Sequence, residues 1–363
     1  MANPIWLKQP TAMAALPPAP ARLVLGLVAL LLAFCLTAVT APEPPKAYGD
    51  AAHHAEDRAD ILLYQRIVQG LGEGEDYYPL VAESLRTGNY PLKPFVTFRL
   101  PSLATVQAAF PPAGSFLLMI GLAGAVLRVW WLWLGSATNG RRSQLIGAAL
   151  LVCGVAVLAK PEMVPFHEPW AALLVALSLG CRTEERWGVA VVTGLAAMLI
   201  RETAALYVAV MAGMALIERR PREILGWGAA LTVFALAVAA HAAAVSDVVR
   251  TDDPASPGWA GMLGFGFTVN VLRGTTSLAH LPTGPALLLT GLALFGWAAA
   301  PGALARRVLA TILAYGTLLA LFCRADTFYW GLMIAPAFLV GLVFVPDGLK
   351  DLIAAARLRP RTA

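Results

Sequence analysis

Apolar runs separated by short polar segments recur along almost the whole chain. A helix needs roughly 17–25 predominantly apolar residues to cross the hydrocarbon core of a bilayer. We interpret ten of the runs as membrane-spanning helices, at about residues 22–40, 114–134, 145–159, 169–181, 187–200, 203–217, 224–245, 285–300, 307–323 and 329–346. Several are shorter than this range, so neighbouring helices must shield their ends from lipid. The pattern therefore predicts an all-α, polytopic membrane protein.

The long polar interval of residues 41–113 has a helical pattern of its own. Apolar residues at helical spacing predict an amphipathic helix from Asp57 to Leu71. Asp76 can cap a second helix that closes at Gly88. Residues 95–110 are apolar but too short and too interrupted by proline to span, which favours an interfacial segment. We therefore expect a structured loop and not a linker.

The composition agrees with a membrane protein. The chain is 58% hydrophobic and 13% charged, whereas a soluble domain carries about 25% charged residues. The net charge of +5 comes from basic residues in short turns beside the apolar runs, a pattern that sets membrane topology and gives no reason to expect nucleic-acid binding. Cysteine and histidine spacings typical of metal sites and the common nucleotide-binding motifs are missing from the sequence, so we expect neither a metal nor a cofactor.

The basic turns determine the expected orientation. If the ten spans alternate, one face of the membrane receives Lys8, Arg22, Arg141-Arg142, Arg182, Arg186, Arg219 to Arg222, Arg306-Arg307 and the C-terminal arginines. By the positive-inside rule this face is cytoplasmic. Both termini are then cytoplasmic, and residues 41–113 face the outside. We expect an N-terminal segment 1–21, a single transmembrane domain 22–346 that includes this loop, and a C-terminal tail 347–363.

Asp60 is the first candidate for chemistry. It shares one face of the predicted loop helix with Asp57 and Tyr64. A carboxylate beside a phenol at the membrane surface can act as a general base toward a substrate hydroxyl. The alternative is that Asp57 and Asp60 only cap the start of the helix.

The loop also carries Tyr77, Tyr78 and Arg99. Tyrosines at a bilayer surface commonly anchor a protein among the lipid headgroups. Arg99 lies in an apolar stretch, where a lipid phosphate is the nearest anion, although its stem could also snorkel to the surface.

Further charged residues lie at the ends of apolar runs. They are His167-Glu168, Arg201-Glu202 and Arg324. Ionisable groups at membrane depth are candidates for function by default. Arg201 and Glu202 could equally compensate one another at a tight turn.

These residues belong to short motifs that resemble a known family. They are Asp60-Ile-Leu-Leu-Tyr64, Gly74-Glu-Asp-Tyr77-Tyr78, Tyr90-Pro91, Arg99-Leu-Pro101, His167-Glu168-Pro-Trp170, Ile200-Arg201-Glu202 and Asp326-Thr-Phe-Tyr329. Together with one helix followed by a large outer loop, they resemble uncharacterised bacterial members of the GT-C fold glycosyltransferases. The resemblance covers about residues 57–101, 167–202 and 324–346.

The resemblance implies transfer of a sugar from a polyprenyl-phosphate donor to a cell-envelope glycan or lipid acceptor on the periplasmic face of a bacterial inner membrane, so that residues 41–113 would lie in the periplasm. It also implies that Asp60 is the catalytic base, although Asp57 remains a second candidate. Tyr64, Tyr77, Tyr78, Arg99, His167, Glu168, Arg201, Glu202 and Arg324 would then bind the substrates. Two other functions stay open: a multispan transporter or flippase, and a non-catalytic protein of envelope assembly. A transporter commonly shows internal repeats and paired broken helices, and neither is evident here.

Overall fold

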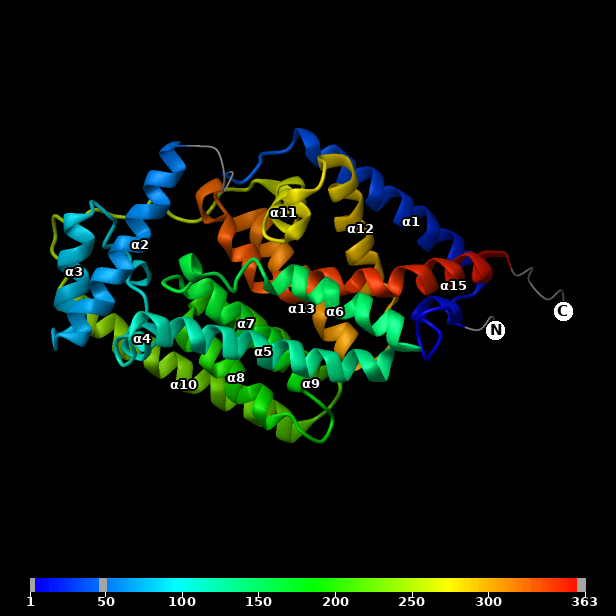
Figure 1. Ribbon diagram of the computed structural model, residues 1–363, viewed down its shortest axis with the longest axis horizontal. Helices are drawn as coiled ribbons and strands as arrows, with labels where there is room; N and C mark the ends of the chain where they lie inside the picture. Colours follow the sequence, from blue (N-terminus) through cyan, green and yellow to red (C-terminus); the bar gives the residue numbers. More distant parts are fainter. Residues whose placement is uncertain (1–3, 46–50, 358–363) are drawn as a thin grey trace.

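The computed structural model describes residues 4–45 and 51–357, with the side chains of 51–57 left out (Figure 1). Within these residues the chain is helical, and only two isolated bridges have β-type pairing, Leu7 with Thr138 and Lys93 with Ala255. Five helical segments are long and apolar enough to cross a membrane. They are Pro18–Thr40, which contains α1 (Pro18–Thr37), α5 (Pro112–Ala137), α10 (Pro221–Ser246), α13 (Ala303–Phe322) and the segment Ala325–Arg357.

The other predicted spans are helical but shorter. They are α6 (Arg141–Val155), α7 (His167–Cys181), α8 (Gly188–Ile200), α9 (Ala205–Ile217) and α12 (Thr283–Ala299). All ten predicted runs are therefore helices, and by length and composition five of them qualify as spans. One helix that the sequence analysis missed, α11 (Gly264–Gly274), lies in the interval between α10 and α12.

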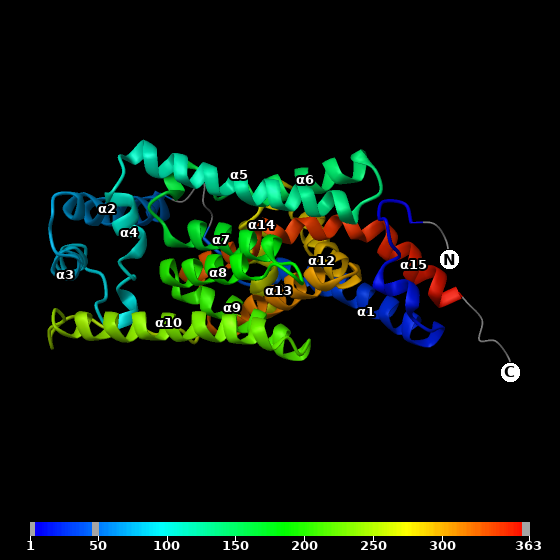
Figure 2. The ribbon, with the colours of Figure 1, turned by 90° about the horizontal axis from the view of Figure 1, so that it is seen from below.

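Residues 347–357 of the predicted C-terminal tail are in fact packed helix. The last apolar run consists of η7 (Ala325–Ile334), α14 (Ala335–Phe338) and η8 (Leu339–Phe344), and it continues directly into α15 (Val345–Arg357). Asp347 on α15 accepts hydrogen bonds from the backbone N–H groups of Ile5, Trp6 and Leu7, at 2.6, 2.7 and 3.0 Å. The N-terminal segment is thereby fastened to α15, and both termini lie at the same end of the molecule (Figures 1 and 2).

The loop helices lie at the opposite end. They are α2 (Ala51–Gly72), α3 (Tyr77–Thr87) and α4 (Ser102–Ala108). The prediction for α3 is confirmed, because its N-cap is Asp76 and its C-cap is Gly88. The predicted start of α2 is wrong, because the helix is already formed at Ala51, six residues before Asp57. The expectation that residues 95–110 do not span is confirmed by α4, which has seven residues.

Four charged residues join helix ends at the end of the bundle opposite α2–α4. This inner ion network consists of Arg182, Glu218, Glu223 and Arg307. Arg182 donates to both carboxylate oxygens of Glu223, at 3.1 and 2.7 Å, and Arg307 donates to both oxygens of Glu218, at 3.0 and 2.6 Å. Arg307 is 0% exposed and Glu223 is 1% exposed. The network therefore fixes neighbouring ends of α7, α9, α10 and α13 at one level.

The helices that meet at this level differ in length. At 1.5 Å per residue, the 26 residues of α10 extend about 39 Å, whereas the 15 residues of α7 extend about 22 Å, so α10 is about 17 Å longer. In Figure 2, α2, α3 and α4 lie between the outer parts of α5 and α10.

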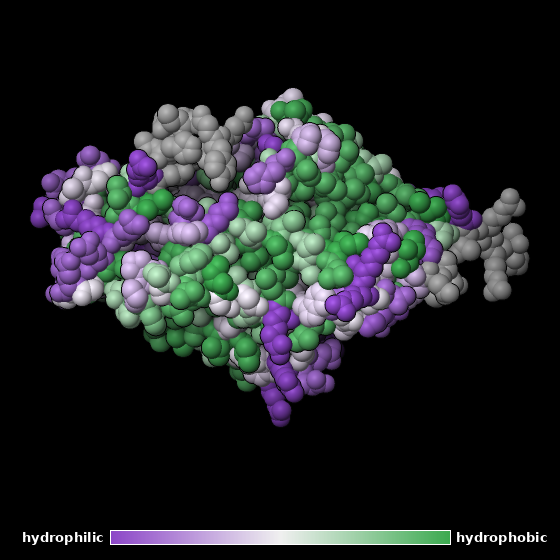
Figure 3. All heavy atoms as spheres, viewed as in Figure 1, coloured by the Kyte–Doolittle hydropathy of each residue, from purple (hydrophilic) through white to green (hydrophobic). Residues whose placement is uncertain are grey.

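Surface polarity follows the same axis. On the face drawn in Figure 3, hydrophobic residues gather over the middle of the molecule and hydrophilic residues cover the end formed by α3. This distribution is typical of a protein with an apolar belt in lipid and polar ends in water.

Candidate functional site

The loop helices are joined to the outer part of α10 through His241. The Tyr78 hydroxyl lies 3.2 Å from Nδ1 of His241, and Nε2 of His241 lies 3.3 Å from the backbone oxygen of Phe98. Since a carbonyl oxygen can only accept, Nε2 carries the proton and Nδ1 accepts from Tyr78. One turn further along α10, Val245 packs into the apolar core of the loop.

A second joint closes the far side of the loop. Arg86 on α3 donates to both oxygens of Asp253, at 2.8 and 2.7 Å, and to the backbone oxygen of Val248 at 2.8 Å. The hydrogen bond from Arg86 lowers the pKa of Asp253 to about 2, so the pair stays ionised at physiological pH. The two joints give the loop a fixed position above α7 and α8.

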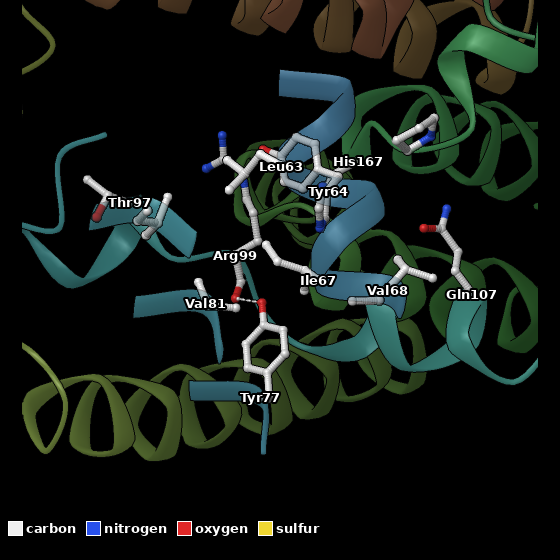
Figure 4. Close-up of a pocket in the computed structure, with 13 residues that line it drawn as sticks. Leu63, Tyr64, Ile67, Val68, Tyr77, Val81, Thr97, Arg99, Gln107 and His167 are labelled. Atoms are coloured by element: carbon white, nitrogen blue, oxygen red, sulfur yellow. Dashed lines mark hydrogen bonds between the residues drawn. The ribbon is translucent and has the colours of Figure 1, made fainter. Parts of the chain in front are cut away.

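A cavity lies between the loop and the start of α7 (Figure 4). We call it the loop cavity. Its volume is about 30 Å³, and its lining residues come from α2, α3, α4 and the segments before α4 and α7. Four of the predicted substrate-binding residues line it: Tyr64, Tyr77, Arg99 and His167. The remaining walls are mostly aliphatic.

Arg99 is held through its backbone and keeps its side chain in the cavity wall. Tyr77 donates to the backbone oxygen of Arg99 at 2.7 Å, shown as a dashed line in Figure 4. Burial raises the pKa of Tyr77, which keeps the phenol protonated as a donor. Nε of Arg99 is buried and has no hydrogen-bond partner among the described residues. An arginine in this state is suited to receive an oxygen ligand.

Arg201 does not line the cavity, and its charge is already balanced. Its Nε lies 2.7 Å from Glu168, its Nη1 lies 3.2 Å from Glu202, and its guanidinium lies 6.0 Å from the centre of the Tyr329 ring. We call Glu168, Arg201 and Glu202 the outer ion cluster. From the sequence, Glu202 is the acidic neighbour of Arg201, and in the structure α7 brings Glu168 to its other side. Binding of a phosphate by Arg201 stays a prediction.

His167 is 3% exposed and lies beside Tyr64, with 5.1 Å between the ring centres. Neither of its ring nitrogens has a hydrogen-bond partner in the described part of the chain. The side chain of His167 therefore leaves both its donor and its acceptor unused among the described residues.

Asp60 lies one helical turn before Tyr64 but does not itself line the cavity. Its Oδ1 accepts a hydrogen bond from the Tyr90 hydroxyl at 2.5 Å, and its charge acts on the Tyr64 phenol. The capping alternative is wrong for both acids, because Asp57 and Asp60 lie within α2 and not at its start. The side chain of Asp57 lies outside the described residues.

Two further predicted residues, Tyr78 and Arg324, also do not line the cavity. Tyr78 binds His241, and Arg324 pairs with Asp326 at 2.5 Å and donates to the backbone oxygen of Gly258 at 2.8 Å. His241 was assigned no role from the sequence, although a histidine inside an apolar 26-residue run is itself a signal of function. Comparison with protein-family models, with curated proteins and with solved structures finds no match to this chain in any of the three.

Proposed function

We propose that this chain is a membrane glycosyltransferase that moves a sugar from a polyprenyl-phosphate donor to a cell-envelope acceptor on the periplasmic face. The observation that carries the proposal is the buried Nε of Arg99, which lies in a tyrosine-lined cavity and has no hydrogen-bond partner among the described residues. The carboxylate of Asp60 lies on α2, one turn before Tyr64 in the cavity wall.

The chemistry needs one base and one cation. Asp60 takes the proton of the acceptor hydroxyl, whose oxygen attacks the anomeric carbon of the sugar. The bond from that carbon to the phosphate oxygen breaks, and polyprenyl phosphate leaves with the electron pair. Arg99 stabilises the charge that develops on the leaving phosphate. A phosphate leaves without protonation, so no second carboxylate is required, and a single displacement inverts the anomeric configuration.

The decisive experiment uses membranes of the native host from which the protein has been deleted. Wild-type protein is re-supplied, and a panel of radiolabelled polyprenyl-phosphate sugars is added. Transfer of label to an envelope acceptor, dependent on the re-supplied protein, is the expected result. If no sugar is transferred above the deletion background, the proposal fails.

We further propose ten membrane crossings, with both termini in the cytoplasm and α2–α4 in the periplasm. In a variant without native cysteines, Glu83→Cys on exposed α3 should react with a membrane-impermeant maleimide in spheroplasts. Arg142→Cys, exposed at the start of α6, should react only after lysis. Labelling of Arg142→Cys and protection of Glu83→Cys in intact spheroplasts would reverse the orientation.

Arg99→Ala should raise the KM for the donor by at least about tenfold, because it removes a charge-assisted contact of roughly 1.5–3 kcal/mol. Protein abundance should change less than twofold, since Tyr77 holds the backbone oxygen of Arg99 and not its side chain. Arg86→Ala is the matched control, because Arg86 belongs to the same loop but pairs with Asp253 outside the cavity. Initial rates against donor concentration test this. An equal rise in KM for both variants would show that the loop, and not the Arg99 charge, is responsible.

A further inference from the structure

The unused hydrogen-bonding groups of the loop cavity indicate what it binds. Both ring nitrogens of His167 and the hydroxyl of Thr97 are buried without a partner among the described residues. A buried polar group without a partner costs about 1–3 kcal/mol, and folded proteins contain few of them. Two such groups in the wall of one cavity are explained if a ligand supplies their partners.

The charges around His167 restrict the kind of partner. Arg99 and Arg201 lie close enough for their charges to act on the ring, and they oppose a further positive charge there. Tyr64 and Glu168 are the other ionisable groups near this point. A neutral imidazole has one donor and one acceptor. A hydroxyl group matches both, whereas an ionised phosphate oxygen can only accept.

The size and lining of the cavity restrict the partner further. A cavity needs about 10–15 Å³ to hold one water molecule, so the 30 Å³ of the loop cavity has room for about two groups of that size. Aliphatic side chains form most of the wall, including Leu63, Ile67, Val68 and Leu85. One methylene group with one hydroxyl fits both the volume and the mixed polarity.

We propose that the loop cavity is a specificity pocket for the hydroxymethyl group of the donor sugar, and that the donor is therefore a hexose and not a pentose. This inference rests on the proposed glycosyl transfer. In a hexopyranose, the carbon that bears the phosphate and the carbon that bears the hydroxymethyl group both flank the ring oxygen. Because Arg99 and His167 line the same cavity, a donor whose phosphate lies at Arg99 can present this hydroxymethyl group to His167.

The test compares donors that share a lipid and differ only at this group. The matched pairs of polyprenyl-phosphate sugars are glucose with xylose, galactose with L-arabinose and mannose with lyxose. Each sugar is added to membranes of the deletion host that contain the re-supplied wild-type protein. For the accepted ring configuration, kcat/KM for the hexose should exceed that for the pentose and for the 6-deoxyhexose by at least about 100-fold. A pentose used as well as its hexose overturns the inference and leaves the transferase proposal intact. Failure of all six sugars overturns both.

Variants of His167 test whether this residue produces the preference for the hexose donor. His167→Leu should reduce the preference for the hexose over its 6-deoxy analogue to about tenfold or less, because the hydroxyl loses its partner. His167→Gln, which keeps a donor and an acceptor, should restore part of the preference. His167→Leu should melt no lower than wild type, since it removes two buried nitrogens that have no partner in the described chain. An unchanged donor preference, or a changed acceptor preference instead, overturns the assignment.

Discussion

Asp60→Asn should reduce kcat for glycosyl transfer by at least about 100-fold, the smallest effect expected when a general base is removed. The amide has nearly the same shape as the carboxylate but cannot take the proton of the acceptor hydroxyl. It can still accept the hydrogen bond from Tyr90, so α2 keeps its link to the segment that follows α3. Transfer of labelled sugar under saturating donor measures the effect, and melting temperature in detergent verifies that the variant is folded.

Asp57→Asn is the matched control, because it makes the same chemical change one turn earlier in the same helix. Since α2 is already formed at Ala51, Asp57 is not at a helix end, and its substitution should change kcat less than about threefold. Tyr90→Phe, which removes the hydrogen bond to Asp60, should lower kcat only several-fold. Equal losses for Asp60→Asn and Asp57→Asn would mean that helix stability is being measured and that Asp60 is not the base.

Arg201→Ala should destabilise the protein by about 3–5 kcal/mol, the range for removing one partner of a buried ion pair. The variant leaves Glu168 and Glu202 near each other without their shared cation, and Glu168 is only 6% exposed. The loss should be visible as a large drop in unfolding free energy in detergent and in the amount of protein recovered from membranes.

Arg324→Ala provides the comparison, because Arg324 also pairs with one nearby acid but at an exposed position. The side chain of Asp326 is 62% exposed, and exposed pairs contribute about 0–1 kcal/mol. Arg201→Ala, Glu168→Gln and Glu202→Gln combined in one chain should recover much of the stability, since no buried charge is then left alone. If Arg201→Ala proves as stable as Arg324→Ala, the outer ion cluster does not stabilise the fold.

Local signals explain how much of the fold could be predicted. Apolar periodicity is a property of each segment, so all ten runs were found, and Asp76 and Gly88 mark the ends of α3 through their own chemistry. Asp347 and Asp351 belong to the predicted C-terminal tail, where charged side chains are expected to be exposed to solvent. They are buried instead, because they accept hydrogen bonds from residues 5–11 at the other end of the chain. Pairing of that kind has no signature in either segment.

The candidate site could likewise be predicted only in part. Tyr64, Arg99 and His167 could be selected because polar groups stand out in apolar surroundings, and the structure brings them together. The interaction partners of each of these groups could not be predicted from the sequence. Glu168 reaches Arg201 across 33 positions, which gives that arginine an ion-pair partner that its neighbours in the sequence do not reveal.

The inner ion network has a consequence for the conformational equilibrium of the protein. A transporter that alternates its access must separate these helix ends once in every cycle. Separating the pairs Arg182–Glu223 and Arg307–Glu218 breaks four charge-assisted hydrogen bonds that form only while these helix ends are together. The network therefore favours the closed state of these ends over a state in which they are apart. This preference suits the proposed transferase, which works from one side of the membrane, better than a carrier that alternates its access.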